Sequence, residues 1–376
     1  MNNQAVREEN SSEALYLAFE LSRKTWKLGC SDGKKPQVRQ VTIAAGDLQA
    51  CGEQIEKAKR RLGLKDDVPV RSCYEAGREG FWLHRALTEM GIDNIVVDAA
   101  SIEVNRRQRR AKTDRMDVEK LVRQLVRYWR GEQDVWRVVR VPSAEAEDGR
   151  QKHRELEILK QERMQHRVRI QSLLCTQGME AKVGAGFLNK LEQLRNWKGV
   201  AVPPQLKQRI EDEYHRLQLV ETQIREVKRK QLQDIKRGSQ DAVLQKVRKL
   251  EQLVSIGWGS SWVFVMELFG WRQFRNRREV AAAIGLTPTP YNSGDSQREQ
   301  GISRAGNRRV RKLLIEIAWC WLRLQPDSEL SRWYQRRFGG GGARMRRIGI
   351  VAMGRGGWRW ICGAMWSLAS PQLARS

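Results

Sequence analysis

Residues 15–30, LYLAFELSRKTWKLGC, decide the fold of the first part of the chain. The apolar run at 15–19 predicts a buried strand, and residues 25–30 predict a second strand that returns beside it. The pattern continues with a strand at 38–43, a helix at 46–62, a strand at 68–74, a helix at 81–90 and a strand at 94–98. This order predicts an α/β domain in which helices pack on the faces of a mixed sheet.

The composition of the sequence changes near residue 148, where a long, charged stretch that is predicted to be helical begins. Leu217, Val220, Ile224 and Val227 alternate spacings of three and four, which predicts a short coiled-coil seam. Such helical hairpins commonly serve as spacers or as contacts between subunits. A third, mainly helical region is expected to hold a loop at 287–304 and a basic helix at 307–324. The predicted fold class is therefore α/β plus α, with domains at 14–147, 148–249 and 250–376.

The charge of the chain indicates its partner. Its 376 residues include 70 Lys and Arg against 44 Asp and Glu, a formal net charge of +26. Nucleic acid is the commonest partner for such a surplus, because each neutralised phosphate releases condensed counterions. We find no signal peptide and no apolar run long enough to cross a membrane, so we expect a cytoplasmic, nucleoid-associated protein. The six cysteines and four histidines are scattered, which argues against a zinc site or a disulfide framework.

Four acids fall at the ends of predicted elements. Glu20 ends the first strand and Glu75 the strand at 68–74, while Asp114 and Asp117 share one side of a predicted helix. Carboxylate oxygens suit Mg²⁺, and two such ions can stabilise the attacking and leaving oxygens of a phosphodiester. Each acid alone is more simply explained as a cap or a surface residue. A neighbouring basic run favours a nucleic-acid site, and its members are Arg106, Arg107, Arg109, Arg110 and Lys112.

A second group of candidates lies between residues 290 and 311. Ser293 precedes a glycine, so the backbone there can approach a ligand closely. Composition alone does not separate Ser293 from Ser296 and Ser303, and each could be an ordinary turn serine. The basic helix that follows is expected to hold a phosphate at its first turn. The residues predicted to bind nucleic acid there are Arg304, Asn307, Arg308 and Arg311.

A weaker candidate is the stretch SIGWG at 255–259, which lies between two predicted helices. Gly257 and Gly259 could present backbone amides to a DNA phosphate. An ordinary turn between helices explains the same residues equally well.

The order of these pieces resembles one protein family. The stretches are YLAFELS at 16–22, CYEAG at 73–77, AKTDRMDVEKL at 111–121 and AAAIGLTPTPYNSGDSQREQGISRAGNRRVRKLLIEIA at 281–318. The chain resembles the DEDD-type transposases of insertion sequences, relatives of the pilin-gene invertase, among which bridge-RNA-guided recombinases are found. The resemblance spans nearly the whole chain from residue 15 onward, and its third and fourth stretches are the most specific.

The resemblance implies a RuvC-like (RNase H-type) domain, a helical coiled-coil insert and a C-terminal transposase domain. It implies that Glu75, Asp114 and Asp117 are metal-binding acids and that Mg²⁺ is the cofactor. It also implies that Ser293 attacks a DNA phosphodiester and forms a phosphoserine-linked strand. Two positions depart from the family. Glu20 stands where aspartate is usual, and its extra methylene would shift the metal; Ile256 stands where proline is usual.

The resemblance further implies the partners. Donor and target DNA are the substrates, and a bridge RNA reads their sequence by pairing while the protein holds phosphates. Two duplexes must be cut and exchanged, so we expect a dimer or tetramer. Ser293 of one subunit could then complete the acidic site of another.

Two other classes of protein stay open at this point. A RuvC-like nuclease would hydrolyse DNA with metal-activated water and would not need Ser293. A non-catalytic nucleic-acid-binding relative would need neither the metal nor Asp114, and Glu20 is the feature that suggests it. A tyrosine recombinase is disfavoured because no Arg-His-x-x-Tyr arrangement is present, and the Cys and His spacing excludes a zinc finger.

Overall fold

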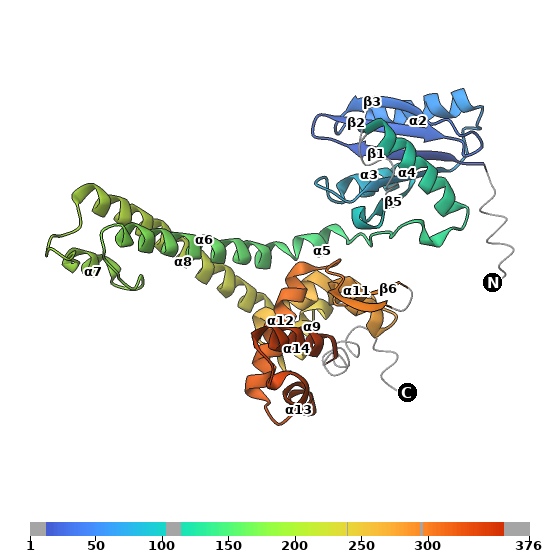
Figure 1. The fold of residues 1–376 in the computed structure, drawn as a ribbon. Helices are drawn as coiled ribbons and strands as arrows, with labels where there is room; N and C mark the ends of the chain where they lie inside the picture. Colours follow the sequence, from blue (N-terminus) through green and yellow to red (C-terminus); the bar gives the residue numbers. More distant parts are fainter. Residues whose placement is uncertain (1–12, 103–113, 239, 294–295, 357–376) are drawn as a thin grey trace. The chain divides into compact units, whose positions relative to one another are not determined.

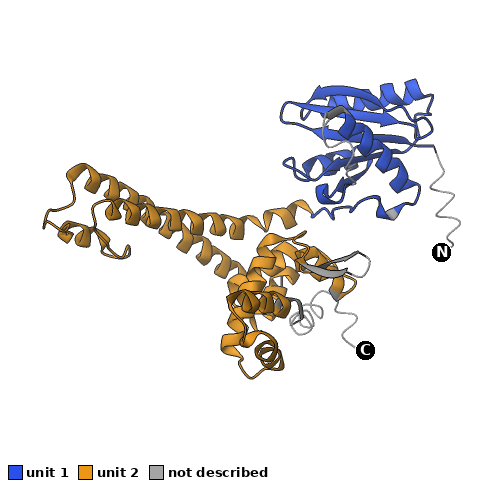
Figure 2. Ribbon diagram, in the orientation of Figure 1, with its two compact units in different colours: residues 1–142 blue, residues 143–376 orange. Residues whose placement is uncertain are grey.

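The computed structural model describes residues 13–102, 114–238, 240–293 and 296–356. The chain forms two compact units, residues 1–142 and residues 143–376, shown in separate colours in Figure 2. Within the described ranges, no helix is both long enough and apolar enough to cross a membrane.

The first unit is built on a five-stranded mixed sheet with the order β3-β2-β1-β4-β5. The antiparallel pairs are β1–β2 and β2–β3, and the parallel pairs are β1–β4 and β4–β5. The predicted strands are confirmed, with bounds β1 (Leu15–Leu21), β2 (Thr25–Ser31), β3 (Arg39–Ala44), β4 (Val70–Glu75) and β5 (Asp93–Val97).

Alternation along β1 explains how both faces of this sheet are covered. Leu15, Leu17 and Phe19 belong to a core that includes residues of α2 (Leu48–Leu62) and α3 (Trp82–Glu89). Tyr16 and Ala18 belong to a second core, which includes residues of α4 (Asp114–Trp129). Because successive side chains of a strand point to opposite faces and both faces are covered, all five residues from Leu15 to Phe19 are buried.

The second unit begins with a helical hairpin. Figure 1 shows α6 (Gln151–Cys175) and α8 (Pro204–Arg237) side by side, with α7 (Phe187–Gln193) at the tip. Val220, Ile224 and Val227 of the predicted seam pack against Leu156 and Leu159 of α6. The seam is therefore buried within one chain, and its apolar side chains are not exposed for contact with a second copy.

The rest of the second unit is mainly helical. Its elements are α9 (Ala242–Glu251), α10 (Trp258–Phe264), the π-helix η4 (Val265–Phe269), α11 (Arg277–Ile284), β6 (Pro288–Ser293), β7 (Ser296–Ile302), α12 (Arg308–Leu324), α13 (Glu329–Tyr334), the π-helix η5 (Gln335–Gly339) and α14 (Ala343–Gly356). The expected loop at 287–304 was wrong, because β6 and β7 form an antiparallel hairpin. Pro288 and Pro290 are tolerated there because both strands of a two-stranded ribbon are edges.

Candidate active site

Two predicted acids lie at the carboxyl ends of neighbouring parallel strands. In the register of β1 and β4, Glu20 and Glu75 directly follow the last paired residues, Phe19 and Tyr74. Side chains two apart in a strand share a face. Ala18 and Cys73 lie in the core beneath α4. Glu20 and Glu75 therefore lie on the face that α4 covers, at one end of the sheet.

The direction of α4 brings Asp117 to the same end. Val118 packs so closely on Gly29, the partner of Ala18 in β1, that a β-carbon at Gly29 would collide with it. Val126, two turns later, lies beside Gly33 near the opposite end of β1. Helix α4 therefore runs antiparallel to β1, and its first turn with Asp117 lies at the Glu20 end.

The acids at this edge are oxygen donors of the type that Mg²⁺ prefers. Glu20 and Asp117 are partly buried and Glu75 is exposed. Among the residues that the structure describes, no group of three or more His, Cys, Asp or Glu is close enough together to hold a metal ion. Asp114 begins α4, one turn before Asp117, and its side chain lies outside the described part. The predicted basic residues at 106–112 also lie outside it.

Asp98 is a further acid at this edge that sequence reasoning did not single out. It follows Val97, which pairs with Glu75. Its carboxylate accepts a hydrogen bond from the Ala100 amide at 3.1 Å and caps the short helix η1 (Ala99–Ser101). The sequence feature that could have identified Asp98 was its position at the end of the predicted strand 94–98. We assign Asp98 a structural role beside the acidic edge.

In the second unit, Ser293 is the last residue of β6 and pairs with Ser296 across the hairpin. Only the backbone of Ser293 is described. The Ser303 amide donates to the Thr287 carbonyl at 2.8 Å, and the Thr287 hydroxyl donates to Ser303 Oγ at 3.2 Å. Ser293 and Ser296 therefore lie at the turn end of the hairpin, whereas Ser303 closes its base.

Two glycines let the chain that leaves the hairpin cross the end of α11. Gly285, the C-cap of α11, has a φ of 73°, and Gly306 has a φ of 140°. A β-carbon at Gly306 would lie 2.5 Å from the Ala283 carbonyl oxygen, and one at Gly285 would lie 2.6 Å from that of Ala305. The Asn307 amide donates to the Ala283 carbonyl at 2.9 Å. The crossing requires both glycines and fixes the base of the hairpin.

Arginines gather where this crossing enters α12. Arg304 and Arg308 are exposed, while Arg311 is partly buried and donates from Nη1 to the Ile284 carbonyl at 2.7 Å. Burial, followed by the charges of Arg304 and Arg308, lowers the pKa of the Arg311 guanidinium. The local concentration of positive charge favours an anion such as a phosphate.

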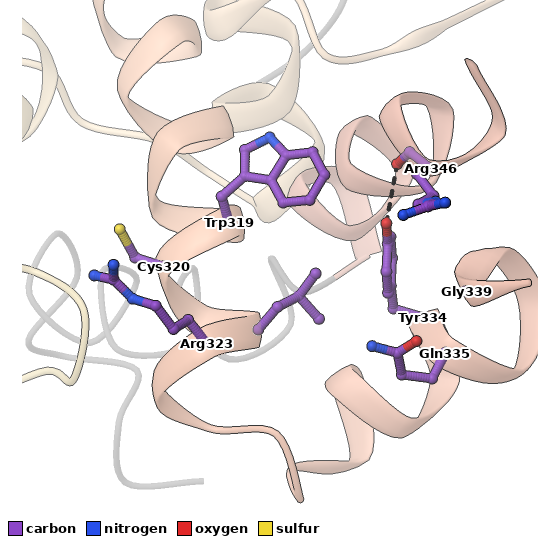
Figure 3. Close-up of a pocket in the computed structure, with 8 residues that line it drawn as sticks. Trp319, Cys320, Arg323, Tyr334, Gln335, Gly339 and Arg346 are labelled. Carbon is purple, nitrogen blue, oxygen red and sulfur yellow. Dashed lines mark hydrogen bonds between the residues drawn. The ribbon is translucent and has the colours of Figure 1, made fainter. Parts of the chain in front are cut away.

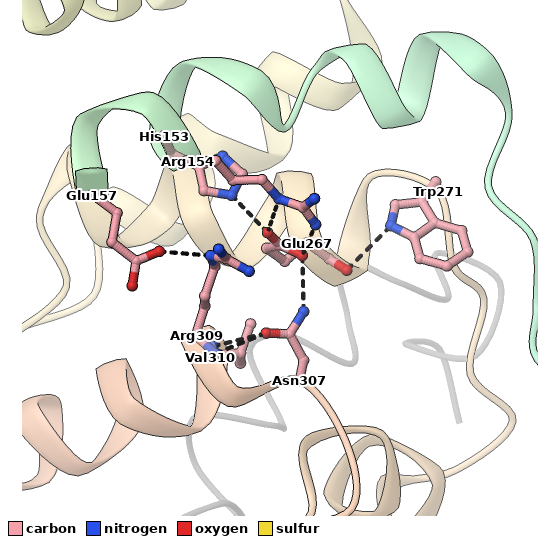
Figure 4. A network of polar contacts seen from close by, with 8 residues as sticks. All are labelled: His153, Arg154, Glu157, Glu267, Trp271, Asn307, Arg309 and Val310. Carbon is pink, nitrogen blue, oxygen red and sulfur yellow. Dashed lines mark hydrogen bonds and ion pairs between the residues drawn. The ribbon is translucent and has the colours of Figure 1, made fainter. Parts of the chain in front are cut away.

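A buried carboxylate missed by sequence reasoning, Glu267, connects three parts of this unit (Figure 4). Its side chain is 2% exposed and accepts hydrogen bonds from His153 Nε2 at 2.8 Å, Arg154 Nε at 3.1 Å and Asn307 Nδ2 at 2.8 Å. Burial by itself raises the pKa of Glu267, but the hydrogen bonds from these partners and the charge of Arg154 hold it well below its usual range. A lone glutamate within the apolar run 265–269 was the available signal.

The first turn of α12 is fixed by the same network. Asn307 Oδ1 accepts hydrogen bonds from the Arg309 amide at 3.0 Å and the Val310 amide at 3.1 Å, so it is the N-cap of α12. Arg309 Nε donates to Glu157 of α6 at 2.6 Å (Figure 4). The side chain of Asn307, predicted to bind nucleic acid, is therefore engaged within the protein, and Arg304 and Arg308 are the exposed candidates.

The stretch at 255–259 combines an open and a buried part. A β-carbon at Gly257 or Gly259 would meet nothing within 4 Å, and Ile256 is buried in the core. Ser255 has a φ of 71°, in the left-handed region. A DNA contact by the two glycines stays a prediction.

Comparisons with known proteins identify the family. The model of the Transposase IS116/IS110/IS902 family matches residues 247–334. This range includes the β6–β7 hairpin with Ser293, called here the serine hairpin, and the crossing of backbones at Gly285 and Gly306. The chain is 39% identical over 334 residues to y4rJ of Sinorhizobium fredii, which is named as a transposase, covering 86% of this chain and 84% of that one.

Two further relatives carry transposase names. The identity is 28% over 280 residues to y4qE of Sinorhizobium fredii, covering 73% of this chain and 64% of the relative. It is 27% over 297 residues to a family 20 transposase of Pseudomonas aeruginosa, covering 76% and 81%. The match to y4rJ over most of both chains, together with the family model, shows that this chain belongs to the IS116/IS110/IS902 transposase family and is a DNA transposase.

Proposed function

We propose that this transposase cuts and rejoins DNA with an acidic site in the first unit and Ser293 in the second. The observation that carries the proposal is the placement of Glu20, Glu75 and Asp117, far apart in sequence, at one end of one sheet. The mixed strand order β3-β2-β1-β4-β5 supports a RuvC-like (RNase H-type) assignment for this unit.

Mg²⁺ is the proposed cofactor, and Glu20, Glu75, Asp114 and Asp117 are its proposed ligands. When bound, the ion would neutralise charge that develops on a reacting phosphate. Glu20 approaches from a strand end, where its extra methylene reaches further over the edge than aspartate would. The four acids would form an oxygen-only ligand set, and bringing them around one ion requires Asp114, whose side chain lies outside the described part, or a shift of the described acids toward one another.

Ser293 is the proposed nucleophile. Its Oγ forms a bond to phosphorus while one bridging P–O bond of the DNA breaks; the serine proton is released and the departing sugar oxygen ends as a hydroxyl. Arg304 and Arg308, which are exposed near the base of the hairpin, are the proposed phosphate ligands. The phosphoserine ester retains the energy of the broken bond, so a sugar hydroxyl can reseal the DNA without another energy source.

The proposed partners are donor DNA, target DNA and a bridge RNA, in a homo-oligomer with at least two active sites. The net charge of +26 supports extensive contact with nucleic-acid phosphates. Ser293 and the acids belong to different compact units, so a site shared between subunits is part of the proposal. The seam on α8 is buried against α6, so assembly must use another surface.

The test compares wild type, Ser293→Ala and Ser296→Ala, each purified with any RNA that accompanies it. Each protein is incubated with labelled junction DNA of its element and Mg²⁺, and covalent protein–DNA adduct is measured under denaturing conditions. We expect an adduct from wild type and Ser296→Ala that needs Mg²⁺, and none from Ser293→Ala.

Other outcomes would contradict the proposal in distinct ways. Hydrolysed ends that form equally with Ser293→Ala would indicate a metal-dependent nuclease. If wild type does not cleave the DNA and Glu20→Asp restores cleavage, the natural chain would be a binding protein that has lost one metal ligand.

A further inference from the structure

A cavity of about 530 Å³ lies between α12, α13, η5 and α14, in a part of the second unit that the proposed reaction does not use (Figure 3). Its volume falls within the range of roughly 300–1,000 Å³ typical of small-molecule sites. The lining residues that matter for its chemistry are Trp319, Cys320, Leu322, Arg323, Tyr334 and Arg346.

The wall of the cavity offers an aromatic face on a fixed support. Helix α12 buries Val310 and Leu314 in the core, yet its Trp319 is 46% exposed. Tyr334 is buried, and its hydroxyl donates to the Arg346 carbonyl at 3.2 Å (Figure 3). An exposed indole on a rigid helix suits stacking by a nucleic-acid base, because every base has a π-face.

The surroundings of the cavity are strongly positive. Arg323 and Arg346 line it, and the Nε of Arg346 donates to the Gly341 carbonyl at 2.9 Å, which orients its guanidinium. The same helices carry further exposed arginines, namely Arg332, Arg336, Arg337, Arg344 and Arg347. The described acids from α12 to α14 are Glu316, Asp327 and Glu329, and Glu316 pairs with Lys312. This charge complements a phosphate backbone and disfavours a basic or neutral apolar partner.

We propose that this cavity binds an unpaired nucleotide of a single-stranded nucleic acid, with the base stacked on Trp319 and the adjoining phosphates held by Arg323 and Arg346. The proposal rests on the chain handling nucleic acid, but it needs neither Ser293 nor the acidic edge. Single-stranded DNA and RNA share this chemistry, and the experiment separates them.

The first experiment measures anisotropy of labelled oligonucleotides of about 12 nucleotides, a length suited to single-strand sites. The probes are single-stranded DNA, single-stranded RNA and duplex DNA of one mixed sequence. We expect Trp319→Ala to weaken single-strand binding about 10-fold, in line with the loss of one stacked base, and to change duplex binding less than about twofold. Trp319→Phe should keep most of the affinity, and the strand type with the larger loss is the natural ligand.

The matched control is Trp197→Ala, which removes a 75% exposed indole near the tip of the helical hairpin. It should leave all three affinities unchanged. Equal losses from Trp319→Ala and Trp197→Ala, or equal losses for single strands and duplex, would overturn the proposal. Thermal unfolding of both variants checks that neither substitution disturbs the fold.

A second experiment uses the thiol in the cavity. Cys320 is partly exposed and lines the cavity, whereas Cys175 is exposed at the end of α6. We expect the bound single-stranded oligonucleotide to slow alkylation of Cys320 at least about threefold, as for a site occupied most of the time, and to leave Cys175 unchanged. Equal protection of both thiols, or a Cys320 that is already unreactive in the free protein, would contradict the proposal.

The two proposals fail separately. If wild type forms no covalent adduct at Ser293, the proposed reaction fails, but the anisotropy measurement of single-strand binding at Trp319 is unaffected. Conversely, normal adduct formation by a protein in which Trp319→Ala has no effect on binding would remove the cavity proposal alone.

Discussion

The acidic edge of the first unit and the serine hairpin of the second are positioned by different kinds of interaction. Glu20 and Glu75 owe their place to strand register, and they lie at the end of the sheet, on the face whose apolar core includes residues of α4. The hairpin is held at its base by a crossing of backbones at Gly285 and Gly306 and by the buried carboxylate Glu267, through Asn307.

This difference predicts how each site responds to substitution. A carboxylate at a strand end can be changed without opening the core. Substitution there should therefore lower activity and leave stability unchanged. The supports of the hairpin are buried polar groups and close backbone contacts, so stability and activity should fall together. The following substitutions test this distinction, from the largest expected effect to the smallest.

Glu267→Ala should have the largest effect. It removes the buried acceptor of His153, Arg154 and Asn307, and breaking a buried charge pair such as Glu267–Arg154 by removing one partner costs about 3–5 kcal/mol. The free energy of unfolding of the second unit, measured by urea denaturation, should fall by that amount. Glu251→Ala, an exposed glutamate at the end of α9, should change it by less than about 0.5 kcal/mol. Equal effects of the two substitutions would show that the network does not hold this unit together.

Glu75→Gln should separate activity from stability. Glu75 is a proposed Mg²⁺ ligand, and the loss of its charge would weaken the hold on the ion that stabilises the reacting phosphate, so adduct formation should slow at least about 100-fold. The side chain is exposed, so the unfolding free energy of the first unit should stay unchanged. Glu89→Gln, an exposed glutamate on α3, should affect neither quantity. A Glu75→Gln protein that is unstable but active would reverse the comparison between the two sites.

Gly306→Ala should lower both adduct yield and stability. The new β-carbon meets the Ala283 carbonyl, and the backbone must keep a φ of 140°. Strain of this kind costs about 1–3 kcal/mol. Gly301→Ala is the matched control, because its φ is 94° but a β-carbon there meets nothing within 4 Å. If both substitutions cost the same, backbone strain alone, without the crossing, would account for the loss.

Acidification should lower the unfolding free energy by the smallest amount, and it tests the contribution of the Glu267 charge alone. The pKa of Glu267 lies well below its ordinary value of 4.5 in the folded chain, so its stabilisation is fully present above about pH 4.5 and decreases as the pH falls below it. The slope from this one group is about 1.4 kcal/mol per pH unit. Urea denaturation at pH 7, 5, 4 and 3 should show that slope in wild type and a smaller one in Glu267→Gln. Identical slopes would place the pH dependence in other carboxylates.

Much of the first unit could be predicted from the sequence because its strands are short apolar runs bounded by polar turns. The strand from residue 15 and the helix at α2 were found by local pattern alone. The hairpin β6–β7 was missed because Pro288 and Pro290 normally disfavour a strand, and only the absence of a third strand makes them acceptable. Glu267 was missed because its three partners come from residues 153, 154 and 307, which no local pattern brings together.

The sequence by itself determined the nucleic-acid partner through its net charge, the elements of the sheet through their apolar periodicity, and the family through motifs at fixed spacing. Tertiary structure decided which surfaces those elements use. It turned the α8 seam toward α6 of the same chain, brought Asp117 to the Glu20 end of the sheet, and engaged Asn307 in a cap and a buried hydrogen bond. The physical reason is that propensity and charge act over a few residues, whereas burial and hydrogen-bond partners depend on segments that meet only after the chain has folded.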